Sequence, residues 1–513
     1  MPSHNTELSD PTTTETGHPN RWAVLWILCG SLVIVVVSVS SLNVAIPAIQ
    51  RSLGTSGSEL QWIIDAYALT FAGLLLPAGA VGDRYGRREA LLGGLAVFGL
   101  ASVGGMLAGS AGELIAWRAL MGAGAAFIMP ATLSIIATVF PPAERGRAIA
   151  IWAGFAGAGG AIGLLSSGLL LEAFWWGSVF LVNVPMVIIM VVAVVLIVPT
   201  SRDPEATPLD PIGGVLSVIG LGALVFGIIE GPEVGWGSTT AMVSFAIATV
   251  ALVAFVFWEL NTRYPMLDPR FFTKREFSLG SIVITLAFFG IFGMFFAVTQ
   301  YLQFVQEYSA LEAAVRILPY GLVLLVVSPR SATLSARFGS RPVMVGGLIL
   351  AAIGFGGLAL VRPDTAYLHV GSALVLVALG TGLLMPPATT ALVASLPPEK
   401  AGVGSAMNDT TREVGGSIGI AVVGALLSIG YRDGLGSALD NAPVEVAEAG
   451  HDSIGGLLAA AAELPDAIAG PLLETGRLAF TDGMRLGMGA AAATLVVAAA
   501  LVAAFYPSPE ETS

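Results

Sequence analysis

The sequence predicts an all-α polytopic membrane protein, on the evidence of its composition, its long apolar runs and an internal repeat. Of the 513 residues, 55% are hydrophobic and only 11% are charged. Soluble domains carry about 25% charged residues, so this composition is typical of a chain with many membrane spans. A span needs about 20 apolar residues to cross the hydrocarbon core. Fourteen runs of this chain reach that length.

The runs follow one another from the first helix to the end of the chain. Residues 1–20 are polar and predict a disordered cytoplasmic tail. The first run is too long for a signal-peptide core and has no basic leader, so we expect a retained helix. The fourteen runs span about 22–49, 59–81, 88–109, 112–139, 147–171, 177–199, 211–230, 239–259, 278–305, 312–331, 341–361, 367–395, 401–429 and 484–506.

Lysine and arginine are distributed unequally between the two sides of the predicted bundle. If both termini share one side, fifteen basic residues fall on that side and five on the other. Loops rich in Lys and Arg stay in the cytoplasm, so both termini are predicted to be cytoplasmic. We therefore expect a multi-pass protein of the plasma (inner) membrane.

Two pairs of similar segments reveal the internal repeat. GDRYGRR at 82–88 corresponds to SARFGSR at 335–341, with Arg84 and Arg337 separated by 253 positions. Downstream, MPATLSIIATVFPPAERG resembles PPATTALVASLPPEKAG at nearly the same offset. A repeated helical bundle is a transporter design, in which the substrate site lies near the midplane between the halves.

The repeat defines the expected domains. The first six-helix half covers 21–200 and the second covers 278–506. The two helices within 211–259 have no repeat partner and are predicted to be an insertion. A long extracellular loop is expected at 430–483, where acidic residues are concentrated. Such a loop could gather cations near an entrance, or its acids could simply be solvated.

Several classes of site are excluded by what the sequence lacks. It has one cysteine, Cys29, and therefore no disulfide within the chain or thiolate metal cluster. Its four histidines fall in the tail, in loops or at helix ends, so we expect no metal site in the membrane. No Walker-type phosphate loop, dinucleotide fingerprint or HExxH motif occurs. The sequence therefore favours neither an enzyme nor an ATP-driven pump.

Five motifs resemble those of one transporter family. GAVGDRYGRR (79–88) resembles the cytoplasmic loop signature of the major facilitator superfamily, and IAWRALMGAGAA (115–126) resembles its fourth-helix arginine motif. NVAIP (43–47), LQWIIDAYAL (60–69) and FLVNVP (180–185) resemble the fourteen-helix branch of drug:proton antiporters, the QacA-type pumps. The resemblance implies the major facilitator fold, with two six-helix halves plus two inserted helices. It also implies a substrate cavity near Asn43, Trp62 and Tyr67.

The loop signature implies a gate on the cytoplasmic side. Its members here are Gly79, Asp83, Arg84, Gly86, Arg87 and Arg88. We expect Asp83 to accept bonds from the amides that begin the next helix, where a negative charge suits the helix dipole. The arginines can bridge to neighbouring helix ends and hold the inner gate shut. The alternative is that they only set the topology.

Few ionisable residues remain inside the predicted membrane, where each costs roughly 2.5–3.5 kcal/mol at the centre unless it is paired or lines a cavity. Asp65 follows Trp62 by three residues, so both share a helix face. An acid beside an aromatic ring suits a lipophilic cation, and a desolvated carboxyl suits a proton carrier. Alternatively, Asp65 is merely paired with an arginine. Arg118 resembles the family's proton-relay arginine, although Met121 replaces the usual glutamine.

A second charged group opens the thirteenth run. Asp409, Arg412, Glu413 and Gly416 have the spacing of one helical face. Glu413 lies about 18 Å from the cytoplasmic start of that helix, near mid-membrane. QacA-type pumps carry two acids four residues apart here, which implies proton or substrate-cation roles for Asp409 and Glu413. The alternative is a structural trio in which Arg412 holds both acids ionised.

Two positions depart from the family pattern. Ser38 stands where many relatives carry an aspartate in the first helix. The antiporter signature of the fifth helix appears as GLLSSG, which keeps Gly163 and Gly168 but has Leu164 in place of proline. The proline would bend the helix. Both departures leave the proton stoichiometry open, and the second also leaves the direction of transport open.

The resemblance implies a proton-coupled antiporter that exports lipophilic, cationic drugs or antibiotics by alternating access. The alternatives are an exporter dedicated to one endogenous antibiotic or lipid, and a membrane-embedded enzyme or sensor. We expect the proton gradient to be the energy source and no cofactor to be needed. The expected partners are a small lipophilic substrate, protons and the lipid bilayer, with no nucleic acid. We expect the protein to be a monomer.

Overall fold

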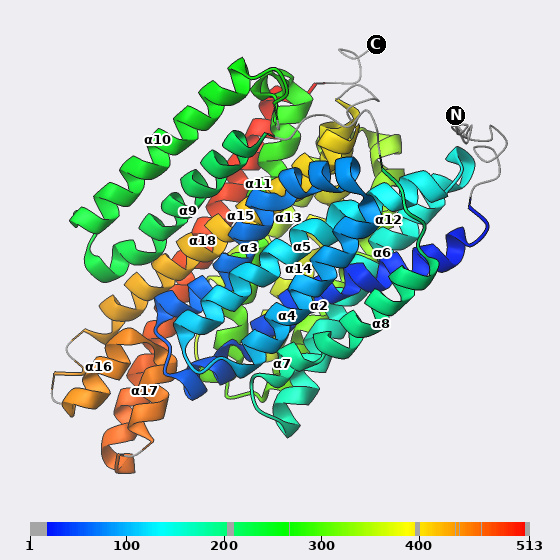
Figure 1. The fold of residues 1–513 in the computed structure, drawn as a ribbon. Helices are drawn as coiled ribbons and strands as arrows, with labels where there is room; N and C mark the ends of the chain where they lie inside the picture. The colour runs from blue at the N-terminus through cyan, green and yellow to red at the C-terminus, as the bar shows by residue number, and fades with distance from the viewer. Residues whose placement is uncertain are drawn as a thin grey trace, which may run out of the picture.

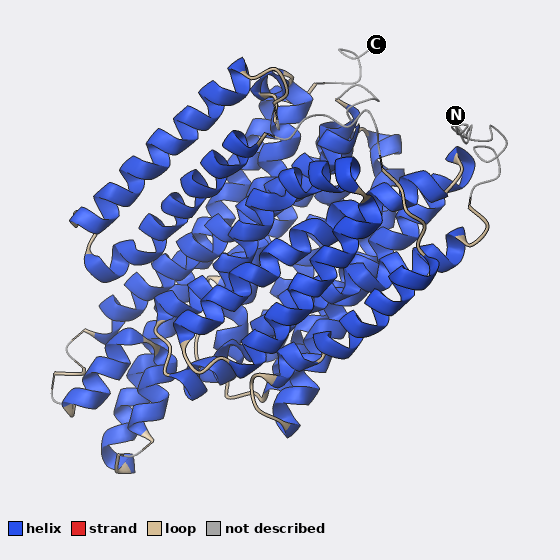
Figure 2. Cartoon of the chain, in the orientation of Figure 1, coloured by secondary structure: helices blue, strands red, loops and turns tan. Residues whose placement is uncertain are grey.

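Long helices run side by side through the molecule (Figure 1). The computed structural model describes residues 18–202, 210–265, 267–395, 401–436, 438–440, 442–462 and 464–507. Within these ranges every regular element is a helix (Figure 2). The predicted all-α fold is confirmed, as expected for a chain whose backbone groups must be satisfied within each segment in lipid.

The first half contains five long helices and a sixth span that is interrupted near its start. Two helices begin at serine caps: Ser56 accepts a hydrogen bond from the Glu59 amide, and Ser110 accepts one from the Glu113 amide. These caps satisfy amides that have no earlier turn to bond. The helices are α2 (Arg21–Leu53), α3 (Gly57–Tyr85), α4 (Arg87–Leu107), α5 (Ala111–Val139), α6 (Pro142–Ala173), α7 (Ser178–Leu181) and α8 (Asn183–Ile197).

The second half has the same plan. The first of its spans ends in a π-helical turn, and the next starts at a capping box made by Ser309 and Glu312. Its elements are η1 (Pro269–Thr273), α11 (Arg275–Gln300), η2 (Tyr301–Val305), α12 (Ala310–Phe338), α13 (Ser340–Leu358), α14 (Tyr367–Ala394), α15 (Ala401–Leu435) and α18 (Asp466–Phe505).

The two inserted helices lie at the edge of the bundle. α9 (Pro211–Val234) and α10 (Thr239–Asn261) form an antiparallel pair on one flank (Figure 1). α9 packs against both α3 and α15, one from each half. The insertion therefore contacts the junction of the halves and not a single half.

Twelve helices of the described chain are long and apolar enough to cross a membrane. α3 raises the count to thirteen when the segments on either side of its bend near Pro77 are taken together. α6 contributes a shorter apolar stretch, Gly159–Ala173. Each of the fourteen predicted runs thus has a helix, although α6 falls short of the length criterion.

The segment 430–483 differs from the predicted loop because most of it is helical. α15 continues to Leu435, and α18 begins at Asp466 and runs for 40 residues. At 1.5 Å per residue, α18 is about 60 Å long, so it projects well beyond a hydrocarbon core. Between them lie α16 (Val444–Asp452) and α17 (Ile454–Ala461), at the end of the bundle opposite the start of α2 and the end of α18 (Figure 1).

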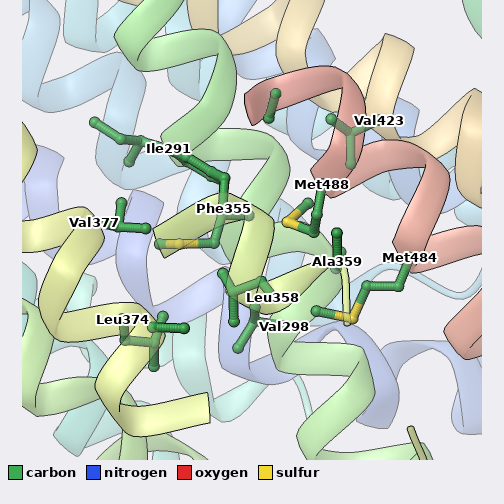
Figure 3. Close-up of a cluster of buried hydrophobic side chains, with 14 of the residues drawn as sticks. Ile291, Val298, Phe355, Leu358, Ala359, Leu374, Val377, Val423, Met484 and Met488 are labelled. Atoms are coloured by element: carbon green, nitrogen blue, oxygen red, sulfur yellow. The ribbon is translucent and has the colours of Figure 1, made fainter. Parts of the chain in front are cut away.

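Each half has its own buried apolar core. In the second half, Met484 and Met488 of α18 pack near Phe355 and Leu358 of α13 (Figure 3). Glycine permits close helix contacts elsewhere: a Cβ on Gly122 of α5 would lie 2.3 Å from the Tyr67 carbonyl oxygen of α3. Such small-residue contacts are typical of helices that associate in lipid.

Candidate functional site

The helix bundle has two ends, which differ in the elements that they carry. We call the end where α2 begins and α18 ends the terminal side. The end that carries α16 and α17 is the α16–α17 side (Figure 1). Both halves contribute residues to the space between these ends.

The loop signature lies on the terminal side, between α3 and α4. Asp83 accepts a 2.6 Å bond from Nε of Arg87, one turn later. Among the described residues no backbone amide donates to Asp83, so the expectation that Asp83 caps the next helix is wrong. The cap position is Gly86, whose φ of 138° requires a residue without a side chain. Gly339, with φ 87°, occupies the equivalent turn of the second half.

The arginines of this loop bond within their own half. Arg88 donates to the carbonyl oxygen of Val195 in α8 at 2.5 Å, and the guanidinium of Arg84 lies over the ring of its neighbour Tyr85. Gly79 lies close to Pro130 of α5. None of the hydrogen bonds found on the terminal side of the described chain joins the two halves. The gating role of the loop stays a prediction.

The halves are instead joined towards the α16–α17 side. Gln303 of η2 donates to the carbonyl oxygen of Val44 in α2 at 3.0 Å. At the same level, Ser309 before α12 bonds Glu172 of α6 at 3.0 Å. The structure is therefore closed on the α16–α17 side, with no equivalent links on the terminal side of the part described.

Arg118 is held in a fully buried pocket of the first half. Its Nε donates to the Ile63 carbonyl oxygen at 3.0 Å, and its Nη1 lies 3.4 Å from the Ser38 hydroxyl. The guanidinium stacks over the Tyr67 ring at 4.4 Å, a cation–π arrangement. Ser38, the position that departs from the family pattern, thus serves as a hydrogen-bond partner for this arginine.

Asp65 is completely buried in α3, yet neither carboxylate oxygen has a hydrogen-bond partner in the described residues. Ser417 of α15 lies near it from the other half, without a hydrogen bond of normal geometry. No ion pair of the described chain includes Asp65. The alternative that Asp65 is paired with an arginine is therefore not what the structure shows.

Within the charged trio of α15, Arg412 pairs with Asp409 and not with Glu413. Arg412 approaches Asp409 at 3.6 Å, and Asn408 donates to the same carboxylate at 3.3 Å. The Arg412 guanidinium also lies 4.6 Å from the Phe288 ring of α11. Its side chain is 41% exposed although it lies deep in α15.

Glu413 faces the first half. It has no ion-pair partner within the described chain, and its charge acts on the Tyr67 phenol across the junction. Tyr67 also carries the Arg118 contact, so the structure brings Arg118, Tyr67 and Glu413 into one neighbourhood. Asp65 lies two residues after Ile63, the residue whose carbonyl holds Arg118.

The other predicted site residues lie elsewhere. The Trp62 indole donates to Glu230 of α9 at 3.3 Å and packs on Phe226 of the same helix. Asn43 is half-buried and donates to the Val39 carbonyl oxygen within its own helix. Their roles as substrate contacts stay predictions.

The two glycines of the fifth-helix signature mark close helix contacts. A Cβ on Gly163 would clash with Ser40 of α2, and a Cβ on Gly168 would lie 2.8 Å from the Leu311 Cα of α12. Gly163 therefore packs within its half, whereas Gly168 packs across the junction.

Sequence reasoning missed the polar groups that surround these residues. Ser417 lies four residues after Glu413, so the helical period alone could have placed it on the neighbouring face. Glu230 carried no such signal, because its contact with Trp62 joins helices that are 168 residues apart. Among the described residues, no cluster of His, Cys, Asp or Glu could hold a metal ion.

Comparisons with known proteins agree with the fold and the motifs. The chain matches the Major Facilitator Superfamily over residues 28–420. It is 36% identical to the multidrug efflux pump LfrA of Mycolicibacterium smegmatis over 96% of both chains. It is 34% identical to the methyl viologen resistance protein SmvA of Salmonella typhimurium, covering 93% of this chain and 97% of that one.

A further relative and a solved structure are also similar to this chain. The puromycin resistance protein pur8 of Streptomyces alboniger is 37% identical, over 79% of this chain and 81% of its own. A crystal structure of a bacterial homologue of the human lysosomal transporter Spinster, inward-facing and unoccupied, superposes with a TM-score of 0.67 at 21% identity. It covers 96% of this chain and 99% of that one, which shows the shared fold. The chain therefore belongs to the major facilitator superfamily, in its fourteen-helix branch of multidrug efflux pumps, and it is a membrane transporter and not an enzyme.

Proposed function

We propose that this protein is a proton-coupled antiporter that exports lipophilic, cationic drugs or antibiotics by alternating access. The names of its relatives support this proposal: a multidrug efflux pump, a methyl viologen resistance protein and a puromycin resistance protein. The excess of basic residues on the terminal side supports cytoplasmic termini and residence in the plasma membrane. Each half, about 21–200 and 278–506, would rock as a unit in a monomer.

The unpaired, fully buried carboxyl of Asp65 carries the proposal. An ionised acid at this depth is costly unless a cation accompanies it. Asp65 has no protein cation beside it in the described chain, so it must bind either a proton or a cationic substrate. A group that exchanges the two at one site couples proton entry to substrate exit.

The remaining charges have separate roles in this mechanism. Arg412 partly compensates Asp409, which leaves Glu413 free to exchange a proton or a cation near Tyr67. Arg118 is held by the Ile63 carbonyl next to Asp65, so a change of charge on Asp65 would be felt by Arg118. We propose that the loop containing Asp83 and Arg88 bridges the halves only when the terminal side closes.

The closure on the α16–α17 side supports a further point about the cycle. If the termini are cytoplasmic, the contacts Gln303–Val44 and Ser309–Glu172 close the extracellular side. The structure would then be the inward-open state, in which Arg412 is reached by solvent from the cytoplasm.

Transport in proteoliposomes tests the proposal. An imposed pH gradient should drive uptake of a lipophilic cation by the wild-type protein. Asp65→Asn should abolish gradient-driven uptake, because the amide can neither release a proton nor neutralise a cation. Glu474→Gln, which removes an exposed acid on α18, should behave as wild type. Uptake that requires sodium, or that ignores the pH gradient, would contradict proton coupling.

The trio in α15 allows a second, internal check of the same proposal. Glu413→Gln should weaken proton coupling and reduce export of divalent cations first, while the protein still inserts. Arg412→Ala should reduce the folded yield, since Asp409 and Glu413 then lack a nearby positive charge. Normal transport by Glu413→Gln across neutral pH would exclude a coupling role for Glu413.

A dedicated exporter is the second candidate, and specific relatives favour it. The chain is 32% identical to a tetracenomycin C resistance and export protein and 37% identical to a cephamycin export protein. Growth inhibition of expressing cells by a panel of cations, neutral antibiotics and anions separates the two candidates. Protection against several unrelated cations indicates a multidrug pump, whereas protection against one compound indicates a dedicated exporter.

A further inference from the structure

A small chamber with several polar groups in its lining lies between the halves on the α16–α17 side. Its volume is about 30 Å³, and its lining includes Gln50 of α2, Gln61 of α3, Gln300 of α11, Tyr431 of α15 and Asp452 of α16. A cavity needs about 10–15 Å³ to admit one water molecule, so this chamber can hold water. Of these helices, α2 and α3 belong to the first half and α11 and α15 to the second, while α16 lies between α15 and α18 in the sequence.

Buried polar atoms face this chamber without partners. Gln50, Gln61 and Tyr431 are each 3% exposed. The amide nitrogens of the two glutamines donate to the Thr55 and Gly57 carbonyl oxygens, at 3.2 and 3.4 Å, which leaves their Oε1 atoms free. The Tyr431 hydroxyl is also unpartnered in the described residues. Since unpaired buried polar groups are costly, water in the chamber is their natural partner.

An outer hollow of about 210 Å³ adjoins the chamber. The two spaces share Gln50, Asp452 and Ser453 in their linings, so these residues separate the chamber from the hollow. Of the three, only Asp452 can take up and release a proton near neutral pH. Asp452 is exposed and lies at the end of α16.

Asp65 does not line the chamber but lies one helical turn further into α3 than Gln61, which does. Gln61 lies one helical turn before Asp65 on the same face of α3, a spacing of about 6 Å. The register across the junction agrees: Gln61 covers Gly424 of α15, and Asp65 lies near Ser417, two turns earlier on that helix. Asp65 is therefore the next ionisable group below the chamber.

We propose that Asp452 and the water-holding chamber form the route by which protons from the α16–α17 side reach Asp65. This inference rests on the proposed proton coupling and adds its entry path. Each transfer exchanges one O–H bond for another: Asp452 gives its proton to a chamber water, and a further water beside Gln61 passes a proton on to the Asp65 carboxylate. The route ends at Asp65, which is fully buried, and so it loads one carboxyl without opening a channel.

The charges around Asp452 suit a proton acceptor. Partial burial, reinforced by Glu233, Glu59 and Glu448, raises the pKa of Asp452 above its usual range, and Arg432 opposes that rise. These groups come from α9, α3, α16 and α15. Arg51 of α2 lines the outer hollow and contributes a further positive charge there. Asp452 thus holds a proton more readily than an isolated aspartate while staying in contact with solvent.

The test uses inside-out vesicles, in which the α16–α17 side faces the lumen if the termini are cytoplasmic. Uptake of tetraphenylphosphonium is measured while the lumenal pH is varied at a fixed outer pH. Asp452→Asn should require about tenfold more lumenal protons for half-maximal uptake, because a local negative charge concentrates cations by about tenfold or more. Affinity for tetraphenylphosphonium in detergent should not change.

Two further variants make the result specific. Gln61→Met keeps the length of the side chain but removes its chamber-facing oxygen, and it should slow proton-driven uptake with unchanged substrate affinity. Glu445→Gln removes an exposed acid from the first turn of the same helix and should follow the wild-type curve. An Asp452→Asn curve that superposes on the wild type would overturn the inference. A wild-type curve that does not depend on lumenal pH would overturn the proposed proton coupling, and this inference with it.

Discussion

The two junctions between the halves differ although the fold repeats. At one junction α3 meets α15, and at the other α6 meets α12. The α3–α15 junction contains Gln61, Asp65 and Ser417, and α9 covers it from outside. The α6–α12 junction closes on Gly168 and Leu311, with a polar contact only at its end, between Ser309 and Glu172.

α9 binds both sides of the junction that it covers. An apolar cluster joins Val225 and Ile229 of α9 to Leu69 of α3 and Ala421 of α15. Near the α16–α17 side, Glu230 accepts the Trp62 indole bond from α3. One turn later, Glu233 pairs with Arg432 of α15 at 2.5 Å.

The inserted helices thus give the two junctions of a repeated fold different properties. The covered junction can keep ionisable groups because α9 shields them from lipid, where each would be costly. The uncovered junction faces lipid and relies on a close contact between small and apolar residues. Three experiments test whether the two junctions differ in this way.

The largest effect is expected at the uncovered junction. Gly168→Ala places a Cβ 2.8 Å from the Leu311 Cα, and the backbone of α12 cannot yield as a side chain would. Overpacking of this kind costs about 1–3 kcal/mol, which corresponds to a shift of about fivefold to more than about a hundredfold against the closed α16–α17 side. Transport should fall accordingly in a vesicle assay.

Two glycines serve as controls for this prediction. Gly160→Ala, on the same helix with nothing within 4 Å, should transport normally. Gly424→Ala at the covered junction meets only the Gln61 side chain, which can move, and its effect should be intermediate. Equal transport by Gly168→Ala and Gly160→Ala would show that the uncovered junction is not tightly packed.

An intermediate effect is expected from Arg432→Ala. Arg432 donates to Glu233, to the Pro232 carbonyl oxygen and to the His451 carbonyl oxygen, so it ties α15 to α9 and α16. Its loss should cost about 1 kcal/mol of stability. It should also increase the population that is open on the α16–α17 side.

Spin-label distances check this second prediction. The single Cys29 allows a cysteine-free background by Cys29→Ser. Labels at Gly112→Cys and Ala366→Cys report the two halves on the α16–α17 side. Arg432→Ala should broaden the distribution towards longer distances, whereas Arg485→Gln, whose partner Asp482 lies in the same helix, should not. Identical distributions would mean that α9 covers the junction without holding it closed.

The smallest effect is expected from Trp62→Phe. The change removes the indole donor to Glu230 but keeps an aromatic ring against Phe226. If Trp62 serves the contact with α9, substrate affinity should stay within about fivefold, since one partly exposed hydrogen bond contributes roughly 1 kcal/mol. A large loss of affinity, measured by ligand-induced fluorescence changes, would return Trp62 to the substrate cavity.

The membrane architecture and the family could be predicted from local features of the sequence. Span length and apolar content are local properties, so fourteen helices could be located without any knowledge of their neighbours. The shared face of the α15 trio could also be predicted, because residues three and four apart lie on one helical face wherever the helix lies. The pairing of Arg412 with Asp409, seen at 3.6 Å, follows from that spacing.

The contacts between these helices could not be predicted from the sequence and are known from the tertiary structure. α9 is apolar almost throughout, so no polar face could reveal that it lies on α3 and α15. Asp83 bonds Arg87 and not a helix amide, because the turn at Gly86 carries the backbone away from the cap geometry. The sequence predicts that Asp65 is buried and that its ionised form is costly in the membrane. It does not predict that Asp65 lacks a partner, because this depends on Arg118 bonding the Ile63 carbonyl and the Ser38 hydroxyl instead. In lipid, hydrophobic periodicity says little about which helices pack together, since packing there depends on the fit of small residues and on a few polar contacts between distant segments.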